Sequence, residues 1–277
     1  MMTLPTGEQI AYWTYHDDKK PTIVMVHGFT GSHEGFQYLV PLLEDFRLIV
    51  PDLPGFGESP LPHEQLTLGG LGELIVDFVD ELKLNEKPHL LGHSMGSLVV
   101  AEAARQHSTQ FARKLILASP VPMPVGPIES RRIGVLLSRL YYIASHRLPK
   151  IGAKIATSRH ISWLGTTAIM TAKDKKLQKT IHKHHYKNLD HISDIGWNRR
   201  LHAEINRTGM TRYKSVLKQF DLLIVNGDRD NVTPLPMQKK IAAATDAKLA
   251  IIPGVGHLAH YEKPAEMAGE IREFLKK

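Results

Sequence analysis

The stretch Gly92-His93-Ser94-Met95-Gly96 decides the fold of this chain. An apolar run precedes it, as expected of a buried strand, and a helix-like segment at residues 97–105 follows it. A serine at such a sharp strand-to-helix turn has a strained backbone and an exposed Oγ. The flanking glycines leave room for the turn. The N-terminus of the following helix directs N–H groups and partial positive charge toward the serine. A plain strand–helix loop could contain the same five residues, so the rest of the chain has to decide between the two interpretations.

Strands and helices alternate on both sides of this turn. Buried strands are expected at residues 21–26, 47–51, 114–118, 222–226 and 248–252. Helices are expected at residues 72–84, 97–105, 235–245 and 262–275. Alternation of this kind predicts an α/β fold with a mostly parallel sheet that helices cover on both faces. Such sheets bind ligands at the carboxyl ends of their strands. The polar residues at those ends are His27, Asp52, Ser94, Asp230 and His257.

The composition is that of an ordinary folded protein. The 277 residues are 42% hydrophobic and 23% charged, with no cysteine, which excludes disulfides and thiolate metal sites. We see no secretory signal and no run near the roughly 20 apolar residues that span a bilayer. These features favour a cytoplasmic protein without a membrane span.

Positive charge is concentrated in one segment. Residues 130–218 contain 19 Lys and Arg against 4 Asp and Glu, a net charge of +15, whereas the rest of the chain carries −8. Such a shift in composition indicates a separate structural unit. Its apolar residues predict a cap interior and a pocket wall: Leu136, Leu137, Leu140, Tyr141, Trp163, Leu164 and Met170.

Five sequence blocks resemble the α/β-hydrolase family in their order along the chain. They are residues 27–31, 52–59, 92–96, 227–230 with Pro234, and 254–257. The resemblance implies a core at residues 1–121, a basic helical cap at residues 122–218 and a second core part at residues 219–277. The cap would be inserted between two strands of the sheet.

Three residues can form a nucleophilic site. A serine hydroxyl needs a base within hydrogen-bond reach, and the base needs a third group that sets its tautomer. We expect Ser94 as the nucleophile, His257 as the base and Asp230 as the orienting acid, in the chain order of this fold. Asp228 competes with Asp230 and His260 with His257; the resemblance favours Asp230, and the glycine-rich loop favours His257.

The remaining site predictions concern backbone groups and histidines. The backbone N–H groups of Phe29 and Met95 are expected to form the oxyanion hole, and His27 to have a structural role. The tract at residues 182–185 looks like a metal site only superficially, so we expect neither a metal nor a cofactor.

The predicted activity is hydrolysis of a small-molecule carboxylic ester through an acyl-enzyme. Serine at position 94 argues against dehalogenases and epoxide hydrolases of this fold, which use an aspartate there. Alternatives are a carbon–carbon bond hydrolase, an enzyme like the menaquinone-pathway synthase, or a ligand receptor on a hydrolase fold.

The basic cap indicates an anionic partner. Candidates are an acidic acyl carrier protein, a phosphate or coenzyme-A group, or an anionic membrane surface; no nucleic-acid motif appears. We favour a carrier protein, which would make the chain similar to biotin-pathway esterases that cleave pimeloyl carrier protein methyl ester. The residues expected to contact it are Arg131, Arg132, Arg199 and Arg200.

Overall fold

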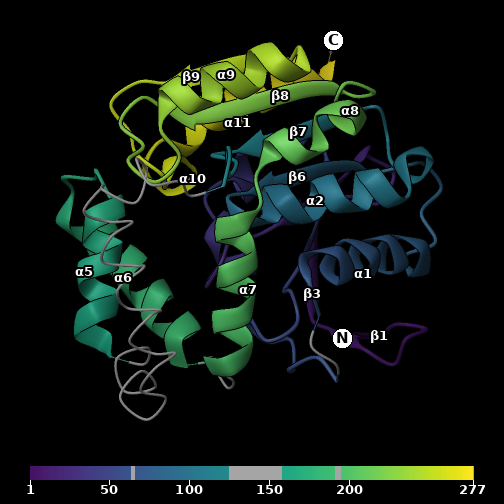
Figure 1. The fold of residues 1–277 in the computed structure, drawn as a ribbon, viewed down its shortest axis with the longest axis horizontal. Helices are drawn as coiled ribbons and strands as arrows, with labels where there is room; N and C mark the ends of the chain where they lie inside the picture. Colours follow the sequence, from purple (N-terminus) through teal and green to yellow (C-terminus); the bar gives the residue numbers. More distant parts are fainter. Residues whose placement is uncertain (64–65, 125–157, 191–194, 277) are drawn as a thin grey trace.

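The computed structural model describes residues 1–63, 66–124, 158–190 and 195–276 (Figure 1). Within these residues, seven strands form one sheet in the order β3-β5-β4-β6-β7-β8-β9. Their bounds are β3 Tyr12–Tyr15, β4 Thr22–Val26, β5 Arg47–Pro51, β6 His89–His93, β7 Lys114–Ala118, β8 Asp221–Gly227 and β9 Lys248–Ile252. Only β3 runs antiparallel to its neighbour; β1 (Met2–Thr3) and β2 (Gln9–Ile10) form a separate antiparallel pair.

The register brings the carboxyl ends of the parallel strands to one edge. β4 pairs with β6 up to Val26 opposite Gly92, and β6 pairs with β7 up to His93 opposite Ala118. β4 is buried along its whole length, as expected of a parallel strand covered on both faces. The loops that follow β4, β6, β8 and β9 therefore meet at this edge, where the site is expected.

Helices form a layer on each face of the sheet (Figure 1). One face packs against α1 (Leu68–Glu81), α2 (Met95–Gln106), α8 (Lys214–Leu217) and α9 (Leu235–Thr245). The other packs against η1 (His33–Phe36), η2 (Val40–Leu42), α10 (Ala259–Glu262) and α11 (Pro264–Lys276). Two short 3-10 helices, η3 (Ser108–Gln110) and η5 (Met210–Tyr213), connect elements. The predicted fold class, a mostly parallel sheet flanked by helices, is confirmed.

Two predicted helices have different bounds in the structure. α1 begins earlier than expected because the Thr67 hydroxyl accepts a hydrogen bond from the Gly70 N–H at 3.1 Å and caps the first turn. The helix expected at residues 262–275 is present as α11, but it begins two residues later than expected, at Pro264, after α10 has ended at Glu262. Proline lacks an N–H and has a fixed φ, so it begins a helix rather than continuing one.

Besides α8, three described α-helices lie between β7 and β8, in the segment predicted to be a cap. They are α5 (Arg159–Ile169), α6 (Lys175–Asp190) and α7 (Ile195–Arg207). α5 and α6 lie to one side of the sheet, whereas α7 joins the main core through Trp197 and Leu201 (Figure 1). The Glu204 carboxylate of α7 also accepts a hydrogen bond from the Leu68 N–H at the start of α1, at 2.6 Å. The boundaries at residues 122 and 218 stay a prediction.

The apolar residues assigned to the cap interior do not all lie there. Trp163 is 46% exposed and Leu164 is 59% exposed, so the prediction that they form cap core or pocket wall is wrong. Met170 is half-buried and packs against Ile181 and Leu258. The predicted positions at 136, 137, 140 and 141 lie outside the described residues. None of the described helices has both the length and the apolarity needed to cross a membrane.

Candidate active site

Ser94 lies at the junction of β6 and α2, in a backbone conformation that residues other than glycine rarely adopt. Its φ is +52° and its ψ is −117°, a strained combination that the surrounding structure has to enforce. A Cβ at Gly92 would lie 2.4 Å from the Gly96 carbonyl oxygen, and one at Gly96 would lie 2.2 Å from the Val26 oxygen. The Ser94 N–H donates to the Ala118 carbonyl at 2.9 Å. Both glycines are therefore required, and the turn presents Oγ at the edge of the sheet.

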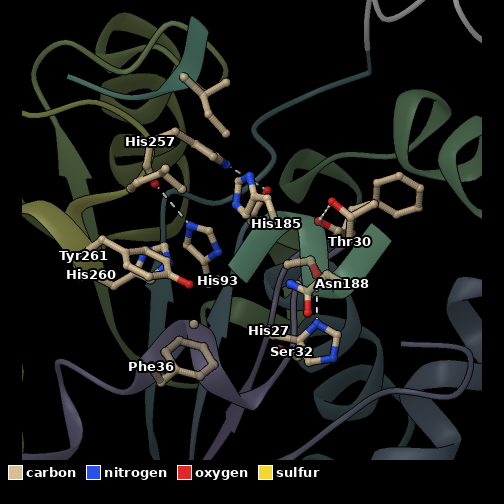
Figure 2. Close-up of a pocket in the computed structure, with 17 residues that line it drawn as sticks. His27, Thr30, Ser32, Phe36, His93, His185, Asn188, His257, His260 and Tyr261 are labelled. Carbon is tan, nitrogen blue, oxygen red and sulfur yellow. Dashed lines mark hydrogen bonds between the residues drawn. The ribbon is translucent and has the colours of Figure 1, made fainter. Parts of the chain in front are cut away.

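A pocket opens beside Ser94 at the carboxyl ends of the strands (Figure 2). Five histidines line it: His27, His93, His185, His257 and His260. The core loop at residues 27–32 forms one wall, and α6 contributes His185 and Asn188 from the cap side. The pocket therefore lies between the sheet edge and the cap.

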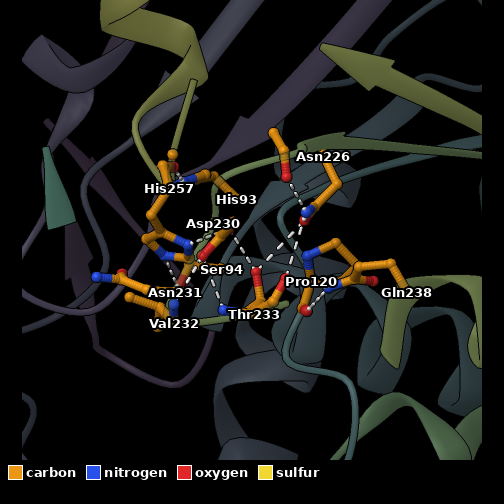
Figure 3. Close-up of polar contacts among 12 residues, drawn as sticks. His93, Ser94, Pro120, Asn226, Asp230, Asn231, Val232, Thr233, Gln238 and His257 are labelled. Atoms are coloured by element: carbon orange, nitrogen blue, oxygen red, sulfur yellow. Dashed lines mark hydrogen bonds and ion pairs between the residues drawn. The ribbon is translucent and has the colours of Figure 1, made fainter. Parts of the chain in front are cut away.

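Ser94, His257 and Asp230 meet at this edge from three separate loops (Figure 3). Nε2 of His257 lies 3.0 Å from the Ser94 Oγ, and Nδ1 of His257 lies 2.8 Å from Oδ2 of Asp230. His257 and Asp230 are buried, whereas Ser94 is half-buried. The structure thus brings all three predicted residues together, with the imidazole between the hydroxyl and the carboxylate.

Hydrogen bonds set the protonation state of Asp230. Burial raises the pKa of this carboxyl, but His257 and the hydrogen bonds from Thr233 outweigh burial and hold the pKa below its usual range. Oδ1 accepts the N–H groups of Val232 and Thr233 at 2.8 Å each, and Oδ2 accepts the Thr233 hydroxyl at 2.7 Å. An ionised carboxylate only accepts, so Nδ1 of His257 donates to it. Nε2 then presents its lone pair to the Ser94 hydroxyl.

Two further histidines surround His257 without adding charge. His93 donates from Nε2 to the His257 carbonyl at 3.2 Å, and its ring centroid lies 4.2 Å from that of His260. Burial, together with His257, lowers the pKa of His93 to about 3. Burial also places the pKa of His260 well below its usual value. Both rings are neutral at pH 7 and support the loop that carries His257.

The competing residues have other contacts. Oδ1 of Asp228 accepts the Gly254 N–H at 2.7 Å and joins the loops after β8 and β9. His260 is buried and packs against His93 and Phe36. Among the described residues, His257 rather than either of these side chains is hydrogen-bonded to the Ser94 hydroxyl.

His27 has the structural role that was predicted. Its Nε2 accepts the Leu53 N–H at 3.0 Å, so its Nδ1 carries the proton and donates to the Gly28 carbonyl at 2.8 Å. The imidazole thereby joins the loop after β4 to the loop after β5. This places the loop at residues 27–31 against the nucleophile turn.

The two predicted oxyanion residues lie beside Ser94. A Cβ added to Gly28 would lie 3.1 Å from the Ser94 Cβ, so the backbone that leads into Phe29 runs against the serine. Met95 is the first residue of α2, and its N–H therefore has no carbonyl partner inside the helix. The oxyanion role of both residues stays a prediction.

Thr233 is a site residue that the sequence analysis missed. It supplies two of the hydrogen bonds that hold the Asp230 carboxylate. Its own carbonyl accepts from Asn226 and Gln238 at 3.3 Å each (Figure 3). The available signal was Asp230 itself, because an aspartate in a turn commonly accepts backbone N–H groups of the residues that follow it.

The predicted partner-binding arginines remain untested. Arg131 and Arg132 lie outside the described residues. Arg199 and Arg200 belong to α7 and are half-buried. Contact of these four residues with an acidic partner therefore stays a prediction.

The histidines of the tract on α6 contact different residues. The His182 ring stacks on Trp163, His184 is hydrogen-bonded to the Tyr261 hydroxyl at 3.1 Å, and Nδ1 of His185 is hydrogen-bonded to the Thr166 hydroxyl at 2.5 Å. Across the part of the chain that is described, no group of three potential ligands is placed to hold a metal ion.

Comparison with known proteins agrees with this geometry. The model of the alpha/beta hydrolase family matches residues 23–270. The chain belongs to the alpha/beta hydrolase family. This confirms the predicted family and, with the sheet order, the predicted fold; it also classes the chain with hydrolases.

Individual proteins similar to this hydrolase match over nearly its whole length. The uncharacterized hydrolase YugF of Bacillus subtilis is 26% identical, over 98% of this chain and 95% of its own. Monoacylglycerol lipase abhd6-B of Xenopus laevis is 25% identical, over 97% of this chain and 82% of its own. A solved thermophilic esterase from Thermogutta terrifontis has a TM-score of 0.79 and 21% identity, over 99% of this chain and 96% of its own. At that identity, the esterase shows a shared fold.

Proposed function

We propose that this hydrolase cleaves carboxylic esters by a serine mechanism. The observation that supports the proposal is the line of contacts from Ser94 Oγ to His257 Nε2 at 3.0 Å and from His257 Nδ1 to Asp230 at 2.8 Å. The strained backbone at Ser94 adds support, because it exposes Oγ at the pocket. A lipase and an esterase among the matched proteins support the reaction class.

The first half of the reaction forms an acyl-enzyme. Ser94 Oγ attacks the ester carbonyl carbon while His257 Nε2 takes the hydroxyl proton. The carbonyl oxygen becomes an oxyanion, which the N–H groups of Phe29 and Met95 stabilise. The tetrahedral intermediate then collapses, its carbon–oxygen bond to the alcohol breaks, and His257 returns the proton to the departing alcohol oxygen.

The second half releases the acid. Water gives a proton to His257 Nε2 and attacks the acyl carbon, and the resulting tetrahedral intermediate expels Ser94 Oγ, which regains that proton. Asp230 remains ionised throughout and stabilises the imidazolium that forms twice per cycle. Neutral His93 and His260 place no competing positive charge beside that imidazolium.

A fluorophosphonate probe and nitrophenyl esters test the proposal. The purified chain is expected to react with the probe and to hydrolyse nitrophenyl acetate and butyrate, whereas Ser94→Ala is expected to do neither. Ser215→Ala is the matched control, because Ser215 is an exposed serine on α8. Labelling of Ser94→Ala at the level of the control would contradict the mechanism.

The natural ester is a separate question. The net charge of +15 at residues 130–218 supports an acyl group carried by an acidic carrier protein, as the sequence analysis favours. A carrier-linked ester and a nitrophenyl ester compared at equal concentration would test it.

A further inference from the structure

The outer surface of α5 carries apolar side chains where a helix facing water normally carries polar ones. Ile161, Trp163 and Leu164 are 40%, 46% and 59% exposed. The inward side of the same helix carries the buried Thr166, which is hydrogen-bonded to His185, and the half-buried Ile169, which lines the pocket. Helices in water usually expose a polar side. The apolar outer side of α5 therefore indicates that this side meets something other than water.

Basic side chains adjoin these apolar residues on α6. The ring of Trp163 stacks on His182, with centroids 5.8 Å apart; Lys179 lies one helical turn before His182, and Lys183 lies one turn after Lys179. Five exposed lysines lie on α6 or just before it: Lys173, Lys175, Lys176, Lys179 and Lys183. Among the ion pairs found between described residues, Lys187 is the α6 lysine that takes part, with Glu34 and Glu58. The basic cluster is therefore not neutralised by these pairs.

We propose that the α5–α6 face, defined by Ile161, Trp163, Leu164, Lys175, Lys179 and Lys183, docks on the headgroup region of an anionic lipid bilayer. An apolar stripe with a tryptophan enters the boundary between headgroups and acyl chains, and neighbouring lysines bind the anionic headgroups. This is peripheral docking, and it is compatible with the described helices, none of which could cross a membrane.

The combination of apolar and basic groups favours a lipid surface over an acidic protein. Lysines alone would serve either partner, since both are anionic. Three exposed apolar side chains on a single helix fit a bilayer, which accepts them without matching shape. The docking does not depend on the proposed ester hydrolysis. If that activity holds, the face would bring the pocket close to the bilayer, because α6 also contributes His185 and Asn188 to the pocket.

Sedimentation with vesicles tests the docking directly. The full chain is mixed, in 100 mM NaCl, with vesicles of phosphatidylcholine alone or of phosphatidylcholine with one quarter phosphatidylglycerol. We expect the chain to sediment with the anionic vesicles and to be released by 500 mM NaCl. Lys179→Glu with Lys183→Glu is expected to weaken binding at least about 30-fold, since each lysine near such a surface contributes roughly a factor of five. Lys239→Glu with Lys240→Glu, an equal charge change at exposed sites on α9, is the matched control.

Tryptophan fluorescence gives a second, site-specific measurement. Of the three tryptophans, Trp197 is buried, Trp13 is half-buried and stacked on His33, and Trp163 is exposed. Anionic vesicles are therefore expected to shift the tryptophan emission of the chain to the blue. The Trp163→Phe variant is expected to bind the vesicles but to show no blue shift. Leu164→Ser is expected to reduce both binding and the shift.

Three results would overturn the lipid proposal. The chain could stay in the supernatant with both kinds of vesicle, as it would if its partner were an acidic protein. The α9 control could lose binding as strongly as the α6 variant, or the blue shift could persist in Trp163→Phe. Ser94→Ala is expected to bind vesicles like the parent chain, so failure of the docking and failure of the proposed hydrolysis are distinguishable.

Discussion

Replacing Asp230 with asparagine exchanges one oxygen for an NH₂ group, and the structure determines where that group has to point. Oδ1 of Asp230 accepts two backbone N–H groups, from Val232 and Thr233. Only the amide oxygen of asparagine can take that place, so its NH₂ occupies the position of Oδ2, facing Nδ1 of His257. The Thr233 hydroxyl, which donates to Oδ2, can rotate and accept from the amide instead. The variant is therefore expected to fold.

The tautomer of His257 is what changes. An NH₂ group donates to Nδ1, so the proton of the neutral imidazole moves to Nε2, which then meets the Ser94 hydroxyl as a donor and cannot take its proton. Loss of the correct tautomer in a triad of this type costs about 10⁴ in kcat. That is roughly 5 kcal/mol of transition-state stabilisation. KM is expected to change little, since Asp230 lies behind His257 as seen from the pocket.

Initial rates on nitrophenyl acetate at pH 7.5 measure the effect, with thermal unfolding as the check on folding. Asp228→Asn is the matched control: Asp228 is an exposed aspartate in the same loop that accepts the Gly254 N–H, a contact that asparagine preserves. We expect the control to retain kcat within about threefold, which is below 1 kcal/mol. A folded Asp230→Asn variant with more than a tenth of the parent kcat would refute the tautomer argument.

Four further changes have expected outcomes. Gly96→Ala forces a Cβ to 2.2 Å from the Val26 oxygen and is expected to destabilise the fold by about 4 kcal/mol or more, seen as a lower Tm, with loss of activity. Gly165→Ala, at an open site in α5, is expected to raise stability by about 1 kcal/mol in the same assay. The pKa of His93 is about 3 in the folded chain and near 6.5 in the unfolded chain. The contribution of neutral His93 to folding stability is therefore fully present above pH 6.5 and declines as the pH falls toward 3. Urea unfolding should show that the free energy of unfolding is lower at pH 5 than at pH 7, with about 2 kcal/mol of the difference due to His93. The difference between the two pH values should be smaller in His93→Gln. Thr233→Val removes the hydroxyl donor to Asp230 but keeps the shape, and kcat/KM for nitrophenyl acetate is expected to fall about tenfold.

The parts of the fold that the sequence predicted correctly are those with a local cause. Strands β4 to β9 are short apolar runs; a glycine follows β4, β6 and β9 within a few residues, and Gly227 is the last residue of β8. Because parallel strands end at a common edge, locating the strands also located Ser94, Asp230 and His257. The two-residue strands β1 and β2 have no such pattern and were not predicted.

The errors concern features that depend on distant contacts. Trp163 and Leu164 were assigned to the cap interior because apolar residues are usually buried, yet which side of α5 faces outward depends on where α6 packs. The hydroxyl of Thr233 acquires its role only when Asp230 and His257 have been brought together. Helix α11 itself was predicted correctly, and only its start differs by two residues, because Pro264 disfavours a helical conformation in the residue before it.

The lysines of α6 and the chemistry of the pocket are separated by the thickness of one helix. On the pocket side of α6, burial lowers the pKa of His185 to about 4, and His93 deeper in the pocket is neutral as well. The lysines of α6 are exposed, and Lys187 is paired with Glu34. At pH 7 the described pocket wall therefore offers neutral hydrogen-bonding groups around Ser94, while the unpaired charge stays outside. In the proposed ester hydrolysis, discrimination among acyl groups then depends on shape and hydrogen bonds inside the pocket, whereas the proposed docking on an anionic bilayer depends on the outer side of the helix.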